Sequence, residues 1–324
     1  MIVDSLGFAG GGALAVLAWH SGYYVAIVPA LLMAGYFGHI VPLMLHDASH
    51  GTLHPVRWKN EAIGMVCGLA SLVPLSAYRC AHALHHRCPG TERDPELWPF
   101  NVPGTPRGVR LGCAIVETLC GCLYTPFLFV RAVLIAESIP TAQKRRIAVE
   151  YTAMALYWGQ TIALVAYFEL WTVYLLGIVG PIAVAGMFQT INKYVEHMGM
   201  TGPGALGITR SVAAEHRVGR ALSASWQHVD HHGAHHLYAR IPHYNLPETT
   251  PLVMSEEAAR ETLYPTYLSA FIAMVKTLGN PIVGAQWETA PKADEPETPW
   301  EAPSTLEYEP RDVYPPKSFL NQRA

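Results

Sequence analysis

Charged side chains are scarce in this 324-residue sequence, and the scarcity narrows the class of protein. Asp, Glu, Lys and Arg make up 15% of the chain and apolar residues 51%, whereas a typical soluble domain has about 25% charged residues. Lysine and arginine are absent from residues 1–56 and 147–192. These absences exclude an ordinary water-exposed surface and indicate a bilayer. The net charge of −3 is too small to indicate binding to nucleic acid.

Cysteine motifs are missing as well. The six cysteines form no Cys-x-x-Cys pair, and no haem-attachment or iron–sulfur motif is present. The pattern indicates reduced thiols that pack as small apolar residues. The N-terminus lacks the basic region and small-residue cleavage site of a removed signal peptide.

The two stretches without lysine or arginine each have room for two helices, because a span takes about 20 apolar residues. Turns are expected near residues 20–22 and 168–170. We therefore predict an all-α integral membrane protein with about four transmembrane helices in two hairpins. Two further apolar segments, 61–77 and 109–136, are interrupted by polar residues and prolines, and we expect helices that lie in or dip into the interface.

The distribution of lysine and arginine orients these helices. Both turns lack them, whereas residues 57–146 and the chain after residue 192 contain them. Because Lys and Arg favour the cytoplasmic side of short loops, we place those regions and the N-terminus there. Residues 255–278 are expected to form an amphipathic helix. Residues 1–285 would be a single domain, and the Pro/Glu-rich residues 286–324 a disordered tail.

Histidine is the most unusual feature, with sixteen in the chain. His46 and His50 are four residues apart, a spacing that places both on one face of a helix. A second group with the same property is His82-x-x-His85-His86, and a dense run extends from 228 to 236. His197 follows the last predicted span. The remaining histidines show no ligand spacing; these are His20, His39, His54, His216 and His243.

Each cluster falls at the cytoplasmic end of a predicted segment, so the clusters can meet in a histidine-rich cytoplasmic cap. Imidazole suits iron, zinc and copper, and eight or nine imidazoles exceed the four ligands of one tetrahedral zinc. Two ions are the economical explanation. A haem needs only one or two axial ligands. A histidine-based metal transporter would need polar residues at mid-membrane depth, and the predicted spans contain few.

These groups resemble the histidine boxes of the membrane fatty acid desaturase superfamily, which also includes hydroxylases, carotenoid ketolases and alkane monooxygenases. The first two groups resemble its first and second boxes, and Asp94-Pro95-Glu96 after the second is also similar. Tyr194-x-Glu196-His197-x-Gly199 resembles a motif of the alkane monooxygenase branch. The resemblance covers roughly residues 30–250.

The third box has two overlapping His-x-x-His-His frames. Residues 232–236 are favoured, because Leu237-Tyr238 and Pro242-x-Tyr244-x-Leu246-Pro247 follow as in the family. The earlier frame, 228–232, resembles the alkane monooxygenase version and stays an alternative. Asp230 stands where the family often has asparagine.

The resemblance implies two non-haem irons that use O₂ to oxidise an unactivated C–H bond of a lipid or fatty acyl chain. Desaturation is the leading interpretation, with hydroxylation or ketolation of a hydrocarbon or carotenoid-type substrate as the alternative. A separate ferredoxin, rubredoxin or cytochrome would supply electrons on the cytoplasmic face. Tyr78, Trp58, Trp98 and Trp226 are candidates to border the substrate path. The implied metal ligands are His46, His50, His82, His85, His86, His197, His232, His235 and His236. Possible alternative or supporting groups are His228, His231, Asp230, Asp47 and Glu196.

Overall fold

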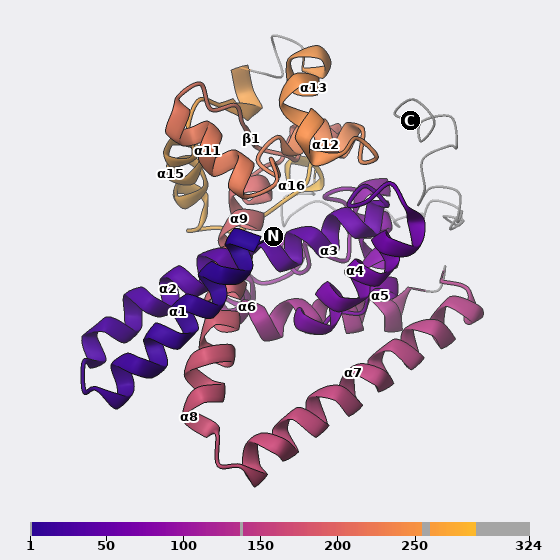
Figure 1. Ribbon diagram of the computed structural model, residues 1–324. Helices are drawn as coiled ribbons and strands as arrows, with labels where there is room; N and C mark the ends of the chain where they lie inside the picture. The colour runs from indigo at the N-terminus through magenta and orange to yellow at the C-terminus, as the bar shows by residue number, and fades with distance from the viewer. Residues whose placement is uncertain (1, 137–138, 255–259, 290–324) are drawn as a thin grey trace.

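The structure is a computed structural model that describes residues 2–136, 139–254 and 260–289. Long helices from the first two thirds of the chain form its lower part, and short helices from the last third form a cap above them (Figure 1). The all-α prediction is confirmed, apart from one pair of two-residue strands.

The first predicted hairpin is present. Helix α1 (Ile2–His20) is followed by the short η1 (Tyr24–Ala26) and by α2 (Ile27–Gly38), which packs along α1. The turn uses Gly22 at φ +75°, a left-handed conformation that glycine adopts without strain. A Cβ on Gly11 would lie 2.8 Å from the carbonyl oxygen of Ala30. The two helices therefore approach closely because small residues line their contact.

Helix α3 (Ile40–His50) continues α2 after a break at His39 and leads from the hairpin to the cap. Helices α4 (Arg57–Ala70) and α5 (Leu75–Arg87) are bent by 94° relative to each other. The apolar segment 61–77 therefore belongs to two helices, because the chain turns at residues 71–74, where the polar and proline interruptions lie, with Leu72 at φ +58°. Such a bent pair is a broken span or a re-entrant loop, as a segment that dips into the interface would be.

The second predicted turn is also present, although the helices on its two sides diverge from it (Figure 1). Helix α6 (Arg107–Ile135) contains a non-helical residue at Cys120. Helix α7 (Thr141–Tyr167) then ends close to the predicted turn. After the turn, α8 (Trp171–Tyr174), the π-helical η2 (Leu175–Val179) and α9 (Gly180–His197) form one helical run that leads back into the cap.

Three helical runs are long and apolar enough to cross a membrane: Tyr24–His50, Arg107–Ile135 and Trp171–His197. The number rises to four if the bent α4–α5 pair is one span. The number agrees with the prediction, but the members differ, since α6 is among them while α1 and α7 are not. One of the polar residues that interrupt α6 has a partner inside the protein, because the buried Glu117 forms an ion pair with Lys193.

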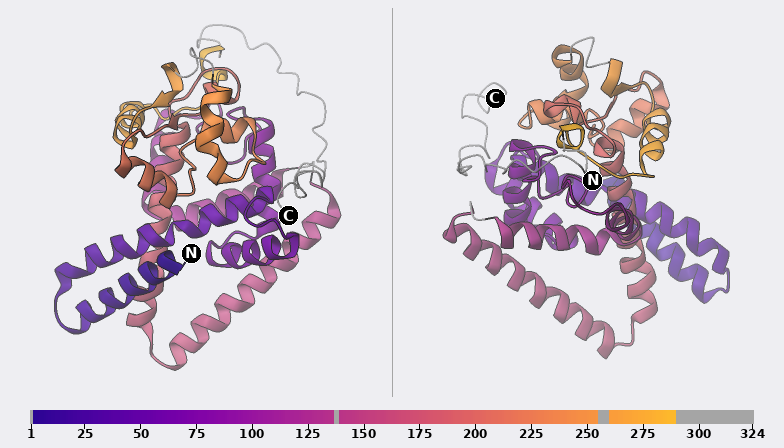
Figure 2. Two further views of the ribbon diagram at one scale, coloured as in Figure 1. Left: turned by 45° about the horizontal axis from the view of Figure 1, so that its top comes forward. Right: turned by 180° about the vertical axis from the view of Figure 1, so that it is seen from behind.

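The cap is made of short elements (Figure 2), and two of them form a parallel strand pair. Strand β1 pairs with β2 in the register Ser211↔Leu263 and Val212↔Tyr264. The elements of the cap are α10 (Gly204–Gly207), β1 (Ser211–Val212), α11 (Arg217–Ser225), α12 (His232–Leu237), η3 (His243–Asn245), α13 (Leu246–Val253), β2 (Leu263–Tyr264), α15 (Tyr267–Thr277) and α16 (Gln286–Thr289).

Two predicted boundaries need correction here. The helix expected over 255–278 is interrupted: residues 260–262 are helical, β2 follows, and α15 begins at Tyr267, where Thr266 forms a capping box with Ser269. Residues 255–259 lie outside the described part. The predicted tail includes α16, where the side chain of Gln286 donates to the carbonyl oxygens of Gly90 and Asn101. The folded part therefore extends to residue 289, and the rest of the predicted tail lies outside the described residues.

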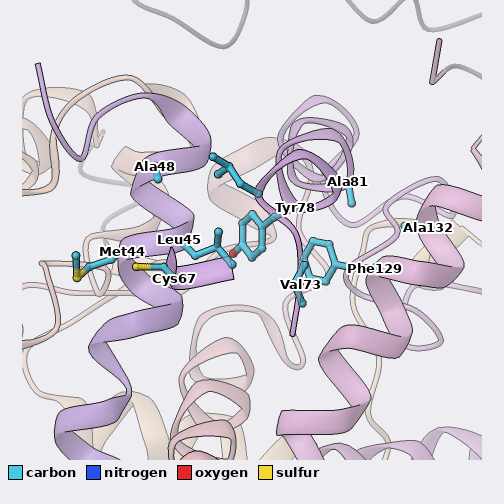
Figure 3. Packing of buried hydrophobic residues seen from close by; sticks show 10 residues of the cluster. Met44, Leu45, Ala48, Cys67, Val73, Tyr78, Ala81, Phe129 and Ala132 are labelled. Atoms are coloured by element: carbon cyan, nitrogen blue, oxygen red, sulfur yellow. The ribbon is translucent and has the colours of Figure 1, made fainter. Parts of the chain in front are cut away.

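A compact apolar cluster fixes the helices that carry the first two histidine groups (Figure 3). Leu45 of α3, Tyr78 of α5 and Phe129 of α6 belong to it, and the rings of Tyr78 and Phe129 stack with centroids 4.7 Å apart. Burial of large apolar side chains stabilises such a junction by about 1.5–3 kcal/mol for each. This cluster holds α3 and α5 beside each other directly beneath the histidines.

Candidate metal centre

Nine histidines from four separate segments come together where the long helices meet the cap. The first box lies on the last turn of α3, the second on α5, His197 at the end of α9, and residues 232–236 on α12. Each spacing of three or four residues places its imidazoles on one helix face. The nine divide into two groups, within which the possible ligand atoms lie within 4.8 Å of one another.

The first group contains five imidazoles. The Nε2 atom of His235 lies 2.9 Å from Nε2 of His46 and 3.0 Å from Nε2 of His86. His86 Nε2 is in turn 3.1 Å from Nε2 of His82. His50 belongs to the same group, and its buried Nε2 has no hydrogen-bond partner. Five nitrogen atoms therefore face one small volume.

The second group contains four buried imidazoles. The Nε2 atom of His232 lies 2.8 Å from Nε2 of His197 and 3.0 Å from Nε2 of His236. His236 Nε2 is 3.2 Å from Nε2 of His85. The rings of His86 and His236 stack with centroids 4.4 Å apart, so the two groups are direct neighbours.

Acceptors behind four of the rings fix where their protons lie. The Nδ1 atom of His85 donates to Asp94 at 2.7 Å, and Nδ1 of His197 donates to the carbonyl oxygen of Ile208 at 2.9 Å. A neutral imidazole that donates through Nδ1 presents a lone pair at Nε2, the arrangement that second-layer carboxylates create for metal ligands. The other two pairs are His46 with Asp47 at 3.1 Å and His82 with Glu96 at 2.9 Å.

Hydrogen bonds between neutral imidazoles do not account for all the Nε2–Nε2 contacts of the second group, because too few protons are present. His197 and His85 stand at the two ends of a chain of three Nε2–Nε2 contacts, and both present lone pairs. Only His232 and His236 have a proton to offer at Nε2, so at most two of the three contacts are hydrogen bonds. The first group has the same order of contacts, with His46 and His82 at its ends. A cation at the centre of each group would accept all the lone pairs at once.

The distances also bear on the coordination geometry. Two nitrogen ligands about 2.1 Å from one ion lie about 3.0 Å apart when their bonds meet at a right angle, and about 3.4 Å apart at the tetrahedral angle. The six Nε2–Nε2 distances run from 2.8 to 3.2 Å. Each group is therefore compact enough to surround one ion, and the first, with five imidazoles, exceeds the four ligands of tetrahedral zinc.

Burial keeps the third-box imidazoles in the form that binds metal. The pKa values of His232, His235 and His236 are held well below their ordinary value, first by burial and then by neighbouring imidazoles. They are therefore neutral at physiological pH, and a neutral imidazole has a lone pair for a cation.

The earlier frame of the third run lies apart from both groups. His228, Asp230 and His231 form a separate cluster of their own. Asp230 accepts from Ser223 at 2.7 Å, and Nδ1 of His231 contacts the hydroxyl of Thr250 at 2.8 Å. Burial raises the pKa of Asp230 to about 7. None of these three side chains supports a histidine of the two groups.

The carboxylates that contact the histidines are only partly those expected from the sequence. Asp47 contacts a histidine of the first group, as expected, and Glu196 lies 3.6 Å from Nδ1 of His232. Asp94 and Glu96, which the sequence placed only within a similar stretch, orient His85 and His82. Their position directly after the second box was the available signal.

An apolar cavity of about 330 Å³ lies beneath the histidines, lined by residues of α1, α2, α3, α5, α6 and α9 and of the α4–α5 turn. A smaller chamber of about 50 Å³ is lined by histidines of both groups, among them His46, His82 and His197. Of the residues expected to border a substrate path, Tyr78 lines both spaces; Trp58, Trp98 and Trp226 line neither.

Comparison with known proteins shows which family the chain belongs to. The family model for fatty acid desaturases matches residues 22–268, well over half of the chain. The chain belongs to the fatty acid desaturase family. An sn-1 acyl-lipid omega-3 desaturase (ferredoxin) from Nostoc sp. (strain 36) is 23% identical over 225 residues, which cover 64% of this chain and 62% of that relative. With three apolar runs of spanning length, this desaturase-family chain is a membrane protein.

Proposed function

We propose that this protein is a membrane oxidoreductase that holds two non-haem irons and uses O₂ to oxidise an unactivated C–H bond of a lipid or fatty acyl chain. The observation that carries the proposal is the pair of imidazole groups directly above an apolar cavity. Family membership and the distant desaturase relative support the reaction class. Two bound ferrous ions would supply the O₂ reduction that no side chain performs.

Desaturation is the leading reaction. A saturated carbon pair gives up two hydrogens, a donor gives two electrons, and two protons are taken up; O₂ leaves as two waters. Hydroxylation or ketolation begins with loss of the same hydrogen and retains oxygen in the product. His197 belongs to the second group, and Glu196 precedes it in the chain. The motif around these two residues resembles one of the alkane monooxygenases, which supports keeping this alternative. Mass spectrometry of the product separates loss of hydrogen from gain of oxygen.

The chain's own residues have definite tasks in either reaction. Asp94, Glu96 and Asp47 hold three imidazoles in the tautomer that presents Nε2. Tyr78 and Phe129 form part of the apolar wall that would exclude water from the substrate. Electrons come from a separate protein, and the word ferredoxin in the relative's name supports a ferredoxin-type donor over a rubredoxin or cytochrome.

Metal analysis of the purified protein tests the proposal. We expect about two irons per chain and an oxidised lipid product in cells that express it. His85→Ala should remove the product, since its ring belongs to the second group. His54→Ala is the matched control, because its Nδ1 only accepts from the backbone N–H of Val56. Zinc as the sole metal, or product formation by the His85 variant, would contradict the proposal.

We place the metal centre on the cytoplasmic side, supported by the lysines and arginines between and after the hairpins. Single cysteines at Ser21, in the first turn, and at Arg93, beside the second box, should then react with a membrane-impermeant thiol reagent from opposite sides. The background would lack the six native cysteines. Labelling of both positions from the same side would refute this topology.

A further inference from the structure

The apolar cavity and the metal chamber meet at a polar boundary. Four residues line both spaces: Tyr78, Glu96, Gln189 and Lys193. A cavity of about 150 Å³ holds benzene. By that measure the 330 Å³ cavity admits roughly a dozen heavy atoms and the 50 Å³ chamber about two or three. A substrate that reaches the histidines therefore passes this boundary only a few atoms from its oxidised carbon.

Lys193 is the only lysine or arginine among the described residues that line the two spaces. Its ammonium forms an ion pair with the fully buried Glu117 of α6 and reaches the carbonyl oxygen of Glu96 at 3.4 Å. Tyr194 also donates to Glu117 at 2.7 Å. Both members of the pair lie in runs of spanning length, where ionisable residues are costly and usually serve a function. An ammonium has three N–H donors, and these contacts use two.

Gln189 lies one helical turn before Lys193 on α9, so both side chains share a face. Its amide oxygen lies 2.9 Å from Nε2 of His39. Since that oxygen only accepts, His39 donates, and the amide NH₂ is left as the donor end of Gln189. His39 is itself fully buried among Phe188 and Trp226, and it belongs to neither metal group. Its position fixes the direction of the Gln189 amide.

The charges around this boundary select the kind of group that these donors bind. Glu96, Glu117 and Glu196 line one or both spaces beside the single ammonium. The ammonium is already paired with the buried Glu117, so a carboxylate or phosphate would have to compete with that pair, whereas a neutral oxygen would accept the remaining N–H donor without displacing it. An alkyl chain alone would leave the third ammonium N–H of Lys193 and the amide NH₂ of Gln189 without an acceptor from the substrate, which costs binding energy.

We propose that Lys193 and Gln189 bind a neutral carbonyl or hydroxyl oxygen of the substrate, placed within about three heavy atoms of the carbon that is oxidised. The substrate is thus a hydrocarbon chain of roughly a dozen atoms or more that already contains such an oxygen. This inference rests on the proposed function only in calling the bound molecule a substrate. The binding preference itself needs no oxidation.

Radiolabelled ligand binding to the purified full-length protein in lipid nanodiscs tests it, under anaerobic conditions and with empty nanodiscs subtracted. Three probes of equal chain length are a linear alkane, its methyl ketone and the fatty acid. We expect the ketone to bind about tenfold more tightly than the alkane. The fatty acid should bind no more tightly than the alkane. Lys59→Met, at an exposed position on α4, is the control that keeps this order.

Variants assign the preference to the two donors. Lys193→Met combined with Glu117→Gln removes the ion pair without leaving a buried charge, and it should bring ketone and alkane within about twofold while alkane binding persists. Gln189→Met should lose part of the preference, and His39→Phe should resemble it, since the amide then loses its fixed direction. The same preference in all variants, or tightest binding of the fatty acid, would overturn the proposal. An alkane and a ketone that bind equally to the wild type would do so as well.

These outcomes are distinct from those that test the reaction. A protein that prefers the ketone but contains no iron would retain this inference and lose the proposed function. A protein with two irons that oxidises plain alkyl chains and shows no ketone preference would do the reverse.

Discussion

The two overlapping His-x-x-His-His frames of the third run share one spacing but have different structures. Residues 232–236 form α12, whose three histidines all enter the two imidazole groups. Residues 227 and 228 instead adopt left-handed backbone conformations, with φ of +54° and +51°, and the side chains of 228 and 231 join a separate cluster. Spacing places imidazoles on one face only where the chain is helical, so the start of the helix decides between the frames.

The largest predicted effect is a difference in bound iron between alanine variants of the two frames, 232–236 and 228–232. His235→Ala removes a ring whose Nε2 lies within about 3 Å of two others, so bound iron should fall from about two to about one per chain and the product should disappear. His228→Ala, in the earlier frame, should keep both irons. Elemental analysis of the two purified variants checks this. Loss of iron in the His228 variant would transfer the ligand role to the earlier frame.

A smaller effect on iron affinity is expected from the carboxylates that hydrogen-bond to the imidazoles. Asp94→Asn weakens the partner of His85 Nδ1, and removal of such a partner typically costs about 10–100-fold in metal affinity or activity. Asp230→Asn is the matched change in the earlier frame and should alter iron affinity less than about twofold, because Asp230 contacts Ser223 instead. Competition with a chelator measures both affinities. Equal losses would show that Asp230 supports the centre.

The smallest effect concerns the turn itself. A non-glycine residue with left-handed backbone costs of order 1 kcal/mol. Gln227→Gly should therefore stabilise the protein by about 1 kcal/mol or less, with iron content unchanged, whereas Gln227→Ala should not stabilise it. Thermal unfolding in detergent, followed together with iron content, checks this. A Gln227→Gly variant that loses iron would mean that this turn positions a ligand.

The sequence predicted the helical class and both hairpin turns, since long uncharged runs and short polar breaks are local signals. It set α6 apart from the spans because Glu117 interrupts the run, whereas α6 has spanning length and that charge is paired with Lys193, 76 residues away. The interruptions within 61–77 marked the place of the bend between α4 and α5, but its sharpness depends on a left-handed Leu72, which no glycine announces. Charge pairing and backbone conformation at such positions depend on neighbours that are distant in the chain.

For the site, the spacing within each histidine group was sufficient to predict which imidazoles share a helix face. The grouping was not predictable: His85 and His86 are adjacent in the sequence, yet they belong to different groups. Adjacent helical residues point about 100° apart, so the facing helices select which ring enters which group. The partners Asp94 and Glu96 became evident only when the chain after α5 folded back onto the rings.

By itself, the sequence determined that this protein is helical, resides in a membrane and has enough imidazoles for two ions, because composition and short-range spacing are local properties. Tertiary structure alone decided how nine rings divide into two groups and which carboxylates lie behind them. It also decided that Lys193 and Gln189 meet at the entrance to the metal chamber. Those arrangements arise from the packing of α3, α5, α9 and α12, and no local pattern specifies how distant helices are packed.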